Sequence, residues 1–438
     1  MRKFSFPKLL IIVLVLLVNC SSLFGQVKQR FPKPEFQTEY SRPDIYLTDA
    51  RAQYLEYIDL FVLFIALSLA SYFAIKQRSR RNIFILLLVS LGYFGFFREG
   101  CVCPVGSVQN VTFAMFNNGY YVPITIVLFF VLPLVFALFY GRVFCSSVCP
   151  LGAIQDVVNF KNTKLPVSLN TFLGIIPYLY LGLALLFAAN GAGFIICQYD
   201  PFVGFFRFGA SFNMLLFGFS LLLLGTVVAR PYCRFLCPYG VLLKWMSYLS
   251  KKHVTITPDY CNNCRLCEDS CPVDAIQLPE EMPKAKDKKS ETKKFIYLFV
   301  LLPVLMFAGG WIGSKMNVQL SKQHFTVWLT EQIELENQGV ISEPSEETKA
   351  FRSSGKKFDE LKSEALQIQE NFVIGGWILG AVIVLILFFK FVNLTIKQKR
   401  EKYEIDKSEC VSCGKCFIYC PYEKVRLGIL SPDEVDNY

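Results

Sequence analysis

Two runs of four cysteines, each ending in proline, are the part of this sequence with the most specific chemistry. Both read Cys-x2-Cys-x2-Cys-x3-Cys-Pro, the spacing of bacterial 4Fe-4S sites. In two-cluster ferredoxins the fourth cysteine of each run binds the neighbouring cluster, so we expect crossed ligation. A zinc site would group its cysteines two and two, which disfavours zinc. The predicted ligands are Cys261, Cys264, Cys267 and Cys420 for cluster 1, and Cys410, Cys413, Cys416 and Cys271 for cluster 2.

A second cysteine pattern is repeated along the chain. Arg142-Val-Phe-Cys145-Ser-Ser-Val-Cys149-Pro150-Leu-Gly152 returns as Arg230-Pro-Tyr-Cys233-Arg-Phe-Leu-Cys237-Pro238-Tyr-Gly240. A fainter pair precedes them, Cys101-Val-Cys103-Pro104-Val-Gly106 and Cys197-Gln-Tyr-Asp200-Pro201-Phe-Val-Gly204. The halves are offset by roughly 90 residues, which indicates an internal duplication of a two-helix unit. Such repeats tend to form a site where the two halves face each other.

The repeated pattern supplies four cysteines, Cys145, Cys149, Cys233 and Cys237, which we call the inner boxes. The members of each pair are one helical turn apart and can share a helix face. Four soft sulfurs suit an iron-sulfur cluster, zinc or cuprous copper, whereas the plain alternative is apolar packing. Because packing alone would not repeat the arginine, proline and glycine as well, we expect a bound metal or cluster whose four sulfurs converge.

Three further cysteines, Cys101, Cys103 and Cys197, could form a second metal site with Asp200. In an oxidising compartment some pair of them could instead form a disulfide. Both interpretations stay open at this point.

The composition is typical of a membrane protein, with 53% hydrophobic residues and 42 phenylalanines in 438 residues. Spanning a bilayer takes about 20 apolar residues, and segments of about this length predict seven helices. The predicted spans are Tyr57 to Ile75, Asn82 to Phe97, Pro123 to Tyr140, Thr171 to Ala189, Ser211 to Ala229, Phe295 to Gly313 and Phe372 to Phe391. Lysines and arginines gather in alternate loops, which predicts that both ferredoxin runs face the cytoplasm of a bacterial inner membrane.

We therefore predict an all-α polytopic membrane protein with about seven transmembrane helices, an internal duplication, and a small split two-cluster ferredoxin-like domain on the cytoplasmic side. The predicted order is a signal peptide (1–25), a short periplasmic segment (26–56), a transmembrane bundle (57–250), ferredoxin half 1 (251–294), a transmembrane helix (295–314), a periplasmic helical insertion (315–371), a transmembrane helix (372–392) and ferredoxin half 2 (393–438).

The sequence lacks the residues that several classes of function require. With two histidines there is no four-histidine set for two bis-ligated haems, and no G-x-G-x-x-G or Walker A loop is present for nucleotide chemistry. The net charge of +10 is explained by cations beside the span ends, so it does not indicate nucleic-acid binding. Lipid is the one partner that the composition implies directly.

The inner boxes, the outer segment Arg98-Glu-Gly-Cys101-Val-Cys103-Pro104-Val-Gly106-Ser-Val-Gln-Asn and the two ferredoxin runs together resemble the NapH and NosR type of membrane polyferredoxin. The resemblance covers about residues 82 to 278 and 404 to 425. It implies a quinone or quinol dehydrogenase connection, a periplasmic redox partner such as nitrous oxide reductase, or a related role in copper reduction and assembly. The flavin domain of some members has no counterpart here, so a flavin would sit on a partner flavoprotein.

We expect a membrane-bound electron-transfer protein that connects a cytoplasmic or quinone donor with a periplasmic acceptor. Two alternatives stay open. One is a metal-handling assembly factor with metal reductase activity at the inner boxes, and the other is a thiol-disulfide relay through Cys101, Cys103 and Cys197.

Overall fold

A computed structural model describes residues 52–100, 103–117, 119–160, 163–256, 264–279, 285–341, 344–395, 403–431, 433 and 435. The first half of the bundle contains α2 (Gln53–Ser71), the π-helical η1 (Tyr72–Gln77), α3 (Arg80–Ser90), the π-helical η2 (Leu91–Phe97), α4 (Pro104–Phe116), α5 (Ile124–Tyr140), α6 (Val143–Ser147) and α7 (Pro150–Val157). The second half contains α8 (Val167–Leu173), α9 (Ile176–Ala189), α10 (Ile195–Tyr199), α11 (Pro201–Arg207), α12 (Phe212–Gly225), α13 (Pro231–Phe235) and α14 (Pro238–Tyr248). The remaining elements are α15 (Leu266–Ser270), β1 (Ile276–Gln277), α16 (Ala285–Lys315), α17 (Asn317–Ser321), α18 (Phe325–Asn337), α19 (Glu346–Ser353), α20 (Phe358–Thr395), β2 (Glu404–Ile405), α21 (Lys415–Tyr419) and α22 (Pro421–Arg426).

Apolar helices occupy all seven places where the sequence predicts spans. Within the described residues, four are long and apolar enough to cross a membrane, namely Gln53–Gln77, Arg80–Phe97, Val167–Ala189 and Phe358–Val392. A fifth span results if the bent pair α11 and α12 is counted as one, while α5 and the apolar part of α16 are shorter. The prediction of a polytopic helical membrane protein is therefore confirmed, but the count of seven is not.

Several helices of the bundle begin at a proline. In α4, α7, α11 and α14 the first residue is proline, and the preceding residue is a cysteine, or Asp200 in the case of α11. Proline suits this first position because its fixed φ fits the helix and its missing N–H would be unpaired there anyway. Cys-Pro thus sets the starts of α4, α7 and α14 and Asp-Pro the start of α11, and each places its leading side chain at a break between helices.

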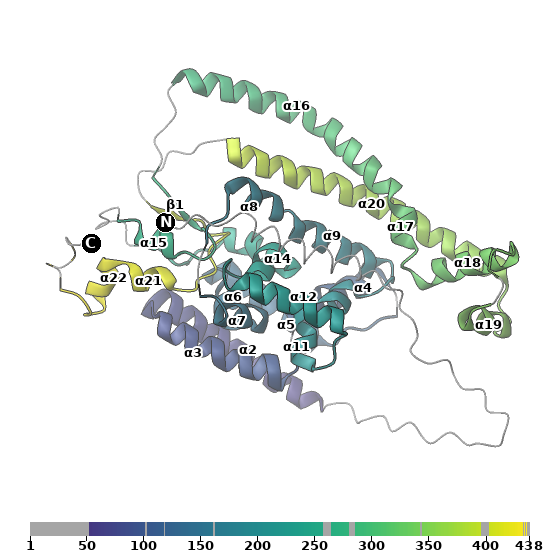
Figure 1. Cartoon of the computed structure of the whole chain (residues 1–438), viewed down its shortest axis with the longest axis horizontal. Coiled ribbons are helices and arrows are strands. Elements are labelled where there is room, and N and C mark those ends of the chain that lie inside the picture. The colour runs from purple at the N-terminus through teal and green to yellow at the C-terminus, as the bar shows by residue number, and fades with distance from the viewer. Residues whose placement is uncertain are drawn as a thin grey trace.

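Glycines allow α16 and α20 to pack closely as an antiparallel pair along one side of the bundle (Figure 1). Gly309 and Gly313 of α16 meet Gly376 and Gly380 of α20, and a methyl group at Gly313 would collide with the carbonyl oxygen of Gly376. Small residues four apart are a common basis for helix contact in membranes. This pair carries the chain away from the first ferredoxin run and returns it to the second.

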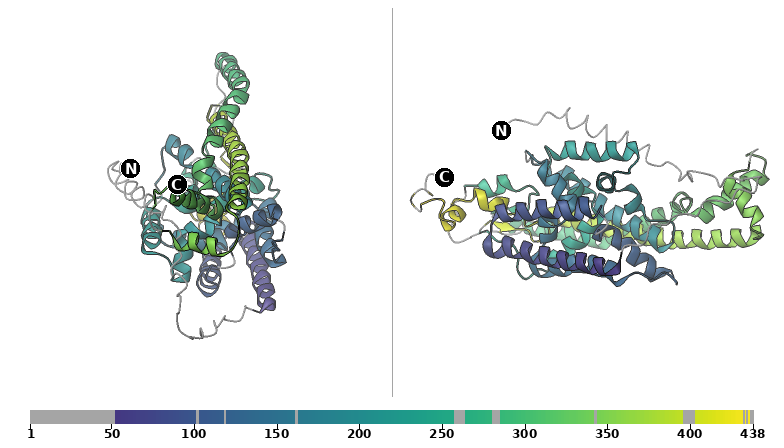
Figure 2. Two further views of the ribbon diagram at one scale, coloured as in Figure 1. Left: turned by 90° about the vertical axis from the view of Figure 1, so that its right-hand side faces the viewer. Right: turned by 90° about the horizontal axis from the view of Figure 1, so that it is seen from below.

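The two ferredoxin segments meet at one end of the molecule, which we call the ferredoxin end (α15, β1, β2, α21 and α22). Strands β1 and β2 pair antiparallel, with Ile276 opposite Ile405. Helices α17, α18 and α19 lie at the opposite end, as the right-hand view of Figure 2 also shows. An even number of long helices between the two runs accounts for their return to the same end.

Some boundaries differ from the predicted ones, and some predictions lie outside the described residues. Helix α16 begins at Ala285, within predicted ferredoxin half 1, and α20 begins at Phe358, within the predicted insertion. In both cases a polar helix continues without a break into the apolar span, because no glycine or proline separates them. The predicted signal peptide, residues 1–25, lies outside the described residues.

Candidate redox metal centres

The predicted ligands of cluster 2 line one cavity at the ferredoxin end. Cys271 of the first run and Cys410, Cys413 and Cys416 of the second surround a volume of about 20 Å³. The pairing of β1 with β2 brings these two loops together, and the backbone N–H of Asp406 extends it by donating to the carbonyl of Ala275 at 2.8 Å. The arrangement agrees with the crossed ligation expected from the spacing.

The predicted ligands of cluster 1 are described in part. Cys264 and Cys267 flank the start of α15, and Cys420 precedes Pro421 at the start of α22, while Cys261 lies outside the described residues. Helices α15 and α21 are in contact. Cys267 packs in a small buried cluster with Ile276 and Tyr403, against which Cys416 also packs. One packed unit therefore contains ligands of both predicted clusters.

The second ferredoxin run rests directly on the first inner box. Arg142 Nη1 donates to the carbonyl of Ser408 at 3.2 Å, and Ser146 Oγ donates to the carbonyl of Ser412 at 3.3 Å. Arg80 Nη1 donates to the carbonyl of Cys413 at 3.0 Å. These bonds satisfy backbone carbonyls of the cluster 2 loop with side chains of the bundle, so the loop and the box form one continuous structure.

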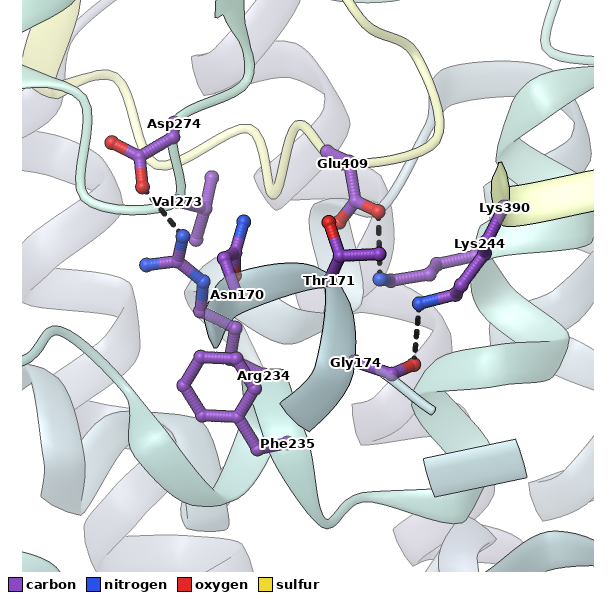
Figure 3. A pocket seen from close by; sticks show the side chains of 10 residues that line it. All are labelled: Asn170, Thr171, Gly174, Arg234, Phe235, Lys244, Val273, Asp274, Lys390 and Glu409. Carbon is purple, nitrogen blue, oxygen red and sulfur yellow. Dashed lines mark hydrogen bonds and ion pairs between the residues drawn. The ribbon is translucent and has the colours of Figure 1, made fainter. Parts of the chain in front are cut away.

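A polar cavity of about 240 Å³ lies beside this contact, between the bundle, α20 and both ferredoxin loops. Figure 3 shows Lys244 bonded to Glu409, the neighbour of Cys410, at 2.8 Å. It also shows Arg234 paired with Asp274 and Lys390 Nζ donating to the carbonyl of Gly174 at 2.7 Å. The two ion pairs, Lys244 with Glu409 and Arg234 with Asp274, join both ferredoxin loops to the membrane part.

The inner boxes bring cysteines of both halves into one buried core. Cys145 and Cys149 belong to the main apolar core, and Cys233 and Cys237 pack against it. Gln155 of α7 donates from Nε2 to Cys233 Sγ at 3.3 Å, and Arg142 Nη2 lies 3.8 Å from Cys145 Sγ. Within the described residues, no group of three His, Cys, Asp or Glu side chains is placed so that it could hold a single metal ion.

Two buried arginines provide a test of which group the inner boxes fit. The side chains of Arg142 and Arg230 are 3% and 1% exposed. Arg230 Nη1 donates to the carbonyl of Cys145 at 2.9 Å, yet Nε of both arginines has no hydrogen-bond partner among the described residues. Buried cations are stable only beside compensating negative charge. Cysteine thiolates that carry an iron-sulfur cluster supply such charge, so the donor set and the two guanidinium groups fit an anionic cluster.

A buried carboxylate completes the charge balance between the boxes and the ferredoxin loop. Asp156 lies 2.6 Å from Arg80, 3.4 Å from Arg230 and 3.6 Å from Lys415, which belongs to the cluster 2 loop. Burial alone would raise the pKa of Asp156, but the charges of Arg230, Arg80 and Lys415 outweigh burial and hold this pKa well below its ordinary value. Asp156 therefore stays ionised.

Sequence reasoning missed two buried glutamines, Gln109 and Gln155. Each follows a Cys-Pro cysteine by six residues and accepts a backbone N–H from the other half of the duplication. The signal was present, because residues 103–109 and 149–155 both read Cys-Pro-x-Gly-x-x-Gln.

Among the outer cysteines, Cys103 and Cys197 are free thiols in the described residues, and Cys101 lies outside them.

Family models for a 4Fe-4S binding domain match three parts of the chain. One model matches twice, at residues 122–168 and 210–257, so each match contains one of the two inner boxes. A second model matches residues 254–277, which contain the first ferredoxin run. The double match agrees with the internal duplication predicted from the sequence.

Curated relatives share parts of this arrangement. The chain is 32% identical to protein NirI of Paracoccus denitrificans over 157 residues, which are 32% of this chain and 22% of NirI. It is 28% identical to an uncharacterized protein of Methanocaldococcus jannaschii over 227 residues, which are 47% of this chain and 91% of that protein. An uncharacterized ferredoxin of the same organism is 34% identical over 61 residues, which are 14% of this chain and 78% of the ferredoxin. No solved structure matches the chain.

Proposed function

The chain belongs to the 4Fe-4S-binding membrane polyferredoxins, and from this premise we propose that it carries single electrons between a donor at the ferredoxin end and an acceptor on the other side of the membrane. Iron-sulfur clusters supply one-electron carriers when bound. The residues of this chain hold, position and charge-balance them. Donor candidates are a cytoplasmic flavoprotein or a quinone, and the acceptor is a periplasmic redox protein.

Cys261, Cys264, Cys267 and Cys420 hold cluster 1 in this proposal, and Cys410, Cys413, Cys416 and Cys271 hold cluster 2. Seven spans, with the ferredoxin end in the cytoplasm, agree with the lysines and arginines beside the helix ends. The pairing of β1 with β2 supports a split ferredoxin domain, because it joins two segments that α16 and α20 separate in the chain.

The contact between the second ferredoxin run and the first inner box carries the proposal. Ser412 and Cys413 of the run accept hydrogen bonds from Ser146 and Arg80 of the bundle. Because Ser146 immediately follows Cys145, its bond to Ser412 places the cluster 2 loop next to the box. Cys145, Cys149, Cys233 and Cys237 then hold a third cluster, compensated by Arg142 and Arg230.

The test is an iron count and an electron paramagnetic resonance spectrum of the full chain, purified without oxygen. We expect at least about twelve irons per chain, because each of these three 4Fe-4S clusters holds about four. The double variant Cys149→Ala/Cys237→Ala should lose about four irons and one signal while both ferredoxin signals remain. Ser147→Ala, on the same short helix as Cys145, is the matched control and should keep every iron.

Other results would count against the proposal. Zinc in place of iron at the two ferredoxin runs would refute electron transfer. An iron content in the double variant equal to that of the wild-type protein would remove the inner boxes from the set of ligands. Copper bound by the boxes of the wild-type protein would favour the metal-handling alternative instead.

A further inference from the structure

The outer group, which we define as Cys103, Cys197 and Asp200, is built on the same plan as the inner boxes. In each place a helix of the first half starts with Cys-Pro-x-Gly-x-x-Gln, at residues 103–109 in α4 and 149–155 in α7. In each place a five-residue helix of the second half carries the facing cysteine, α10 for Cys197 and α13 for Cys233. The correspondence covers both halves.

The glutamines make the same hydrogen bond in both places. Gln109 Oε1 accepts the backbone N–H of Ile196 at 2.9 Å, and Gln155 Oε1 accepts that of Tyr232 at 3.0 Å. Each donor immediately precedes the facing cysteine. Both glutamines are fully buried, where an unmade bond would be costly. Each glutamine therefore fixes a cysteine of the second half against a Cys-Pro helix of the first.

A glycine follows the leading cysteine by three residues in both places, and each packs too closely for a side chain. A Cβ at Gly106 would lie 2.9 Å from Cys197 Sγ, whereas a Cβ at Gly152 would lie 2.5 Å from the carbonyl oxygen of Cys145 and at ordinary contact distance, 3.8 Å, from Cys233 Sγ. A side chain at Gly106 would displace the sulfur. The two sites thus agree in the leading cysteine, the glycine, the glutamine and the facing cysteine.

Asp200 takes the place of Cys237 in the outer group. It precedes proline at the start of α11, as Cys237 does at the start of α14, and is 4% exposed. Its Oδ1 accepts the N–H of Phe202 at 2.9 Å, and its Oδ2 accepts the hydroxyl of Tyr232 at 2.7 Å. Each carboxylate oxygen has a second lone pair, so Asp200 retains the capacity to bind a metal.

A cavity of about 270 Å³ adjoins the outer group and is lined by Cys103, Cys197 and Asp200, with Arg98 and Arg207 among the other lining residues. We propose that the outer group binds an iron-sulfur cluster through two thiolates and the carboxylate of Asp200. Soft sulfur ligands select iron-sulfur clusters, zinc or cuprous copper. Because the outer group repeats the plan of the inner boxes, we assign it the same kind of group, an iron-sulfur cluster.

The position of Tyr232 gives the outer group a role in electron transfer. This role rests on the proposed function. Tyr232 is 2% exposed, precedes Cys233 of the inner boxes, and bonds Asp200 through its hydroxyl. One side chain therefore connects the outer group with the inner boxes. Helices α4 and α11, which start after Cys103 and Asp200, lie farther from the ferredoxin end than α6 and α7 do (Figure 1), where an outgoing electron would next arrive.

The experiment is an iron count and a redox titration of the full chain, purified without oxygen. We expect Cys103→Ser/Cys197→Ser to lose about two to four irons per chain, with the ferredoxin and inner-box signals unchanged. Ser107→Ala is the matched control, because Ser107 lines the same cavity and supplies no ligand in the proposal. The control should keep all of its iron.

Asp200→Cys keeps the experiment informative if the double variant folds poorly. Cysteine already precedes the proline at the start of α4, α7 and α14, so the exchange suits the backbone. A thiolate donates more electron density to iron than a carboxylate does, and ligand identity sets cluster potential. We expect Asp200→Cys to retain its iron and to lower the midpoint potential of one centre only.

The outcomes separate the two proposals. Unchanged iron in Cys103→Ser/Cys197→Ser, with ferredoxin clusters present, refutes the outer site alone. Absence of ferredoxin clusters from the wild-type protein refutes the proposed function. A disulfide between Cys103 and Cys197, seen as thiols that react with an alkylating reagent only after reduction, would replace the cluster with a thiol pair. An unchanged potential in Asp200→Cys would remove Asp200 as a ligand.

Discussion

Replacing Asp156 with asparagine should destabilise the protein more than any exposed charge exchange. The carboxylate compensates three cations, of which Arg230 is as buried as Asp156 itself, each side chain being 1% exposed. Arg80 and Lys415 are 10% and 17% exposed and can regain some water. The cost is therefore dominated by the loss of the carboxylate that pairs with the buried Arg230, about 3–5 kcal/mol.

The assay is unfolding of the purified protein in mixed detergent micelles with rising dodecyl sulfate, followed by tryptophan fluorescence. Glu334→Gln is the control, because its pair with Lys362 is exposed on both sides and should be worth about 0–1 kcal/mol. A carboxylate whose pKa is lowered in the folded state stabilises the fold at every pH above its ordinary pKa. This stabilisation is lost only as the pH falls through the lowered pKa. Since the pKa of Asp156 is lowered, the cost of Asp156→Asn should be equal at pH 6 and pH 8. A cost no larger than that of the control would show that the buried charge network does not stabilise the fold.

Three further predictions concern other parts of the chain. Gly106→Ala should displace Cys197 and lower the iron bound by the outer group, whereas Gly92→Ala, which meets no atom within 4 Å, should not; equal iron in both variants would contradict the close approach. Gly313→Ala should separate α16 from α20 and cost about 1–3 kcal/mol in the same unfolding assay, and an unchanged unfolding curve would contradict the glycine contact. Reporter fusions near Lys286 and after the second ferredoxin run should report the cytoplasm and a fusion at Glu346 the periplasm, so a periplasmic report after the second run would reverse the proposed direction.

Local sequence patterns predicted what depends on neighbours in the chain. The positions of the apolar helices followed from hydrophobic runs, and the helix starts at Pro104, Pro150 and Pro238 follow from the restricted φ of proline. The bonds of Gln109 and Gln155, and the charges around Asp156, depend on how the two halves face each other. No single segment contains that information.

The span count illustrates the same limit. The predicted span Pro123 to Tyr140 agrees with α5 to within one residue, whereas α12 ends at Gly225, four residues before the predicted end at Ala229. The break between α11 and α12 bends the chain by 107°. Hydropathy counts apolar residues but does not register such a bend, so it does not decide whether α11 and α12 form one span.

Electron transfer across a sealed membrane tests the central claim most directly. The full chain is reconstituted into liposomes that contain ferricyanide, dithionite is added outside, and the loss of ferricyanide absorbance is followed against protein-free liposomes. The wild-type protein and Ser147→Ala should transfer electrons at rates within about twofold of each other, and Cys149→Ala/Cys237→Ala should fall to the protein-free rate while both ferredoxin signals remain. Transfer at the wild-type rate in the double variant would contradict a path through the inner boxes.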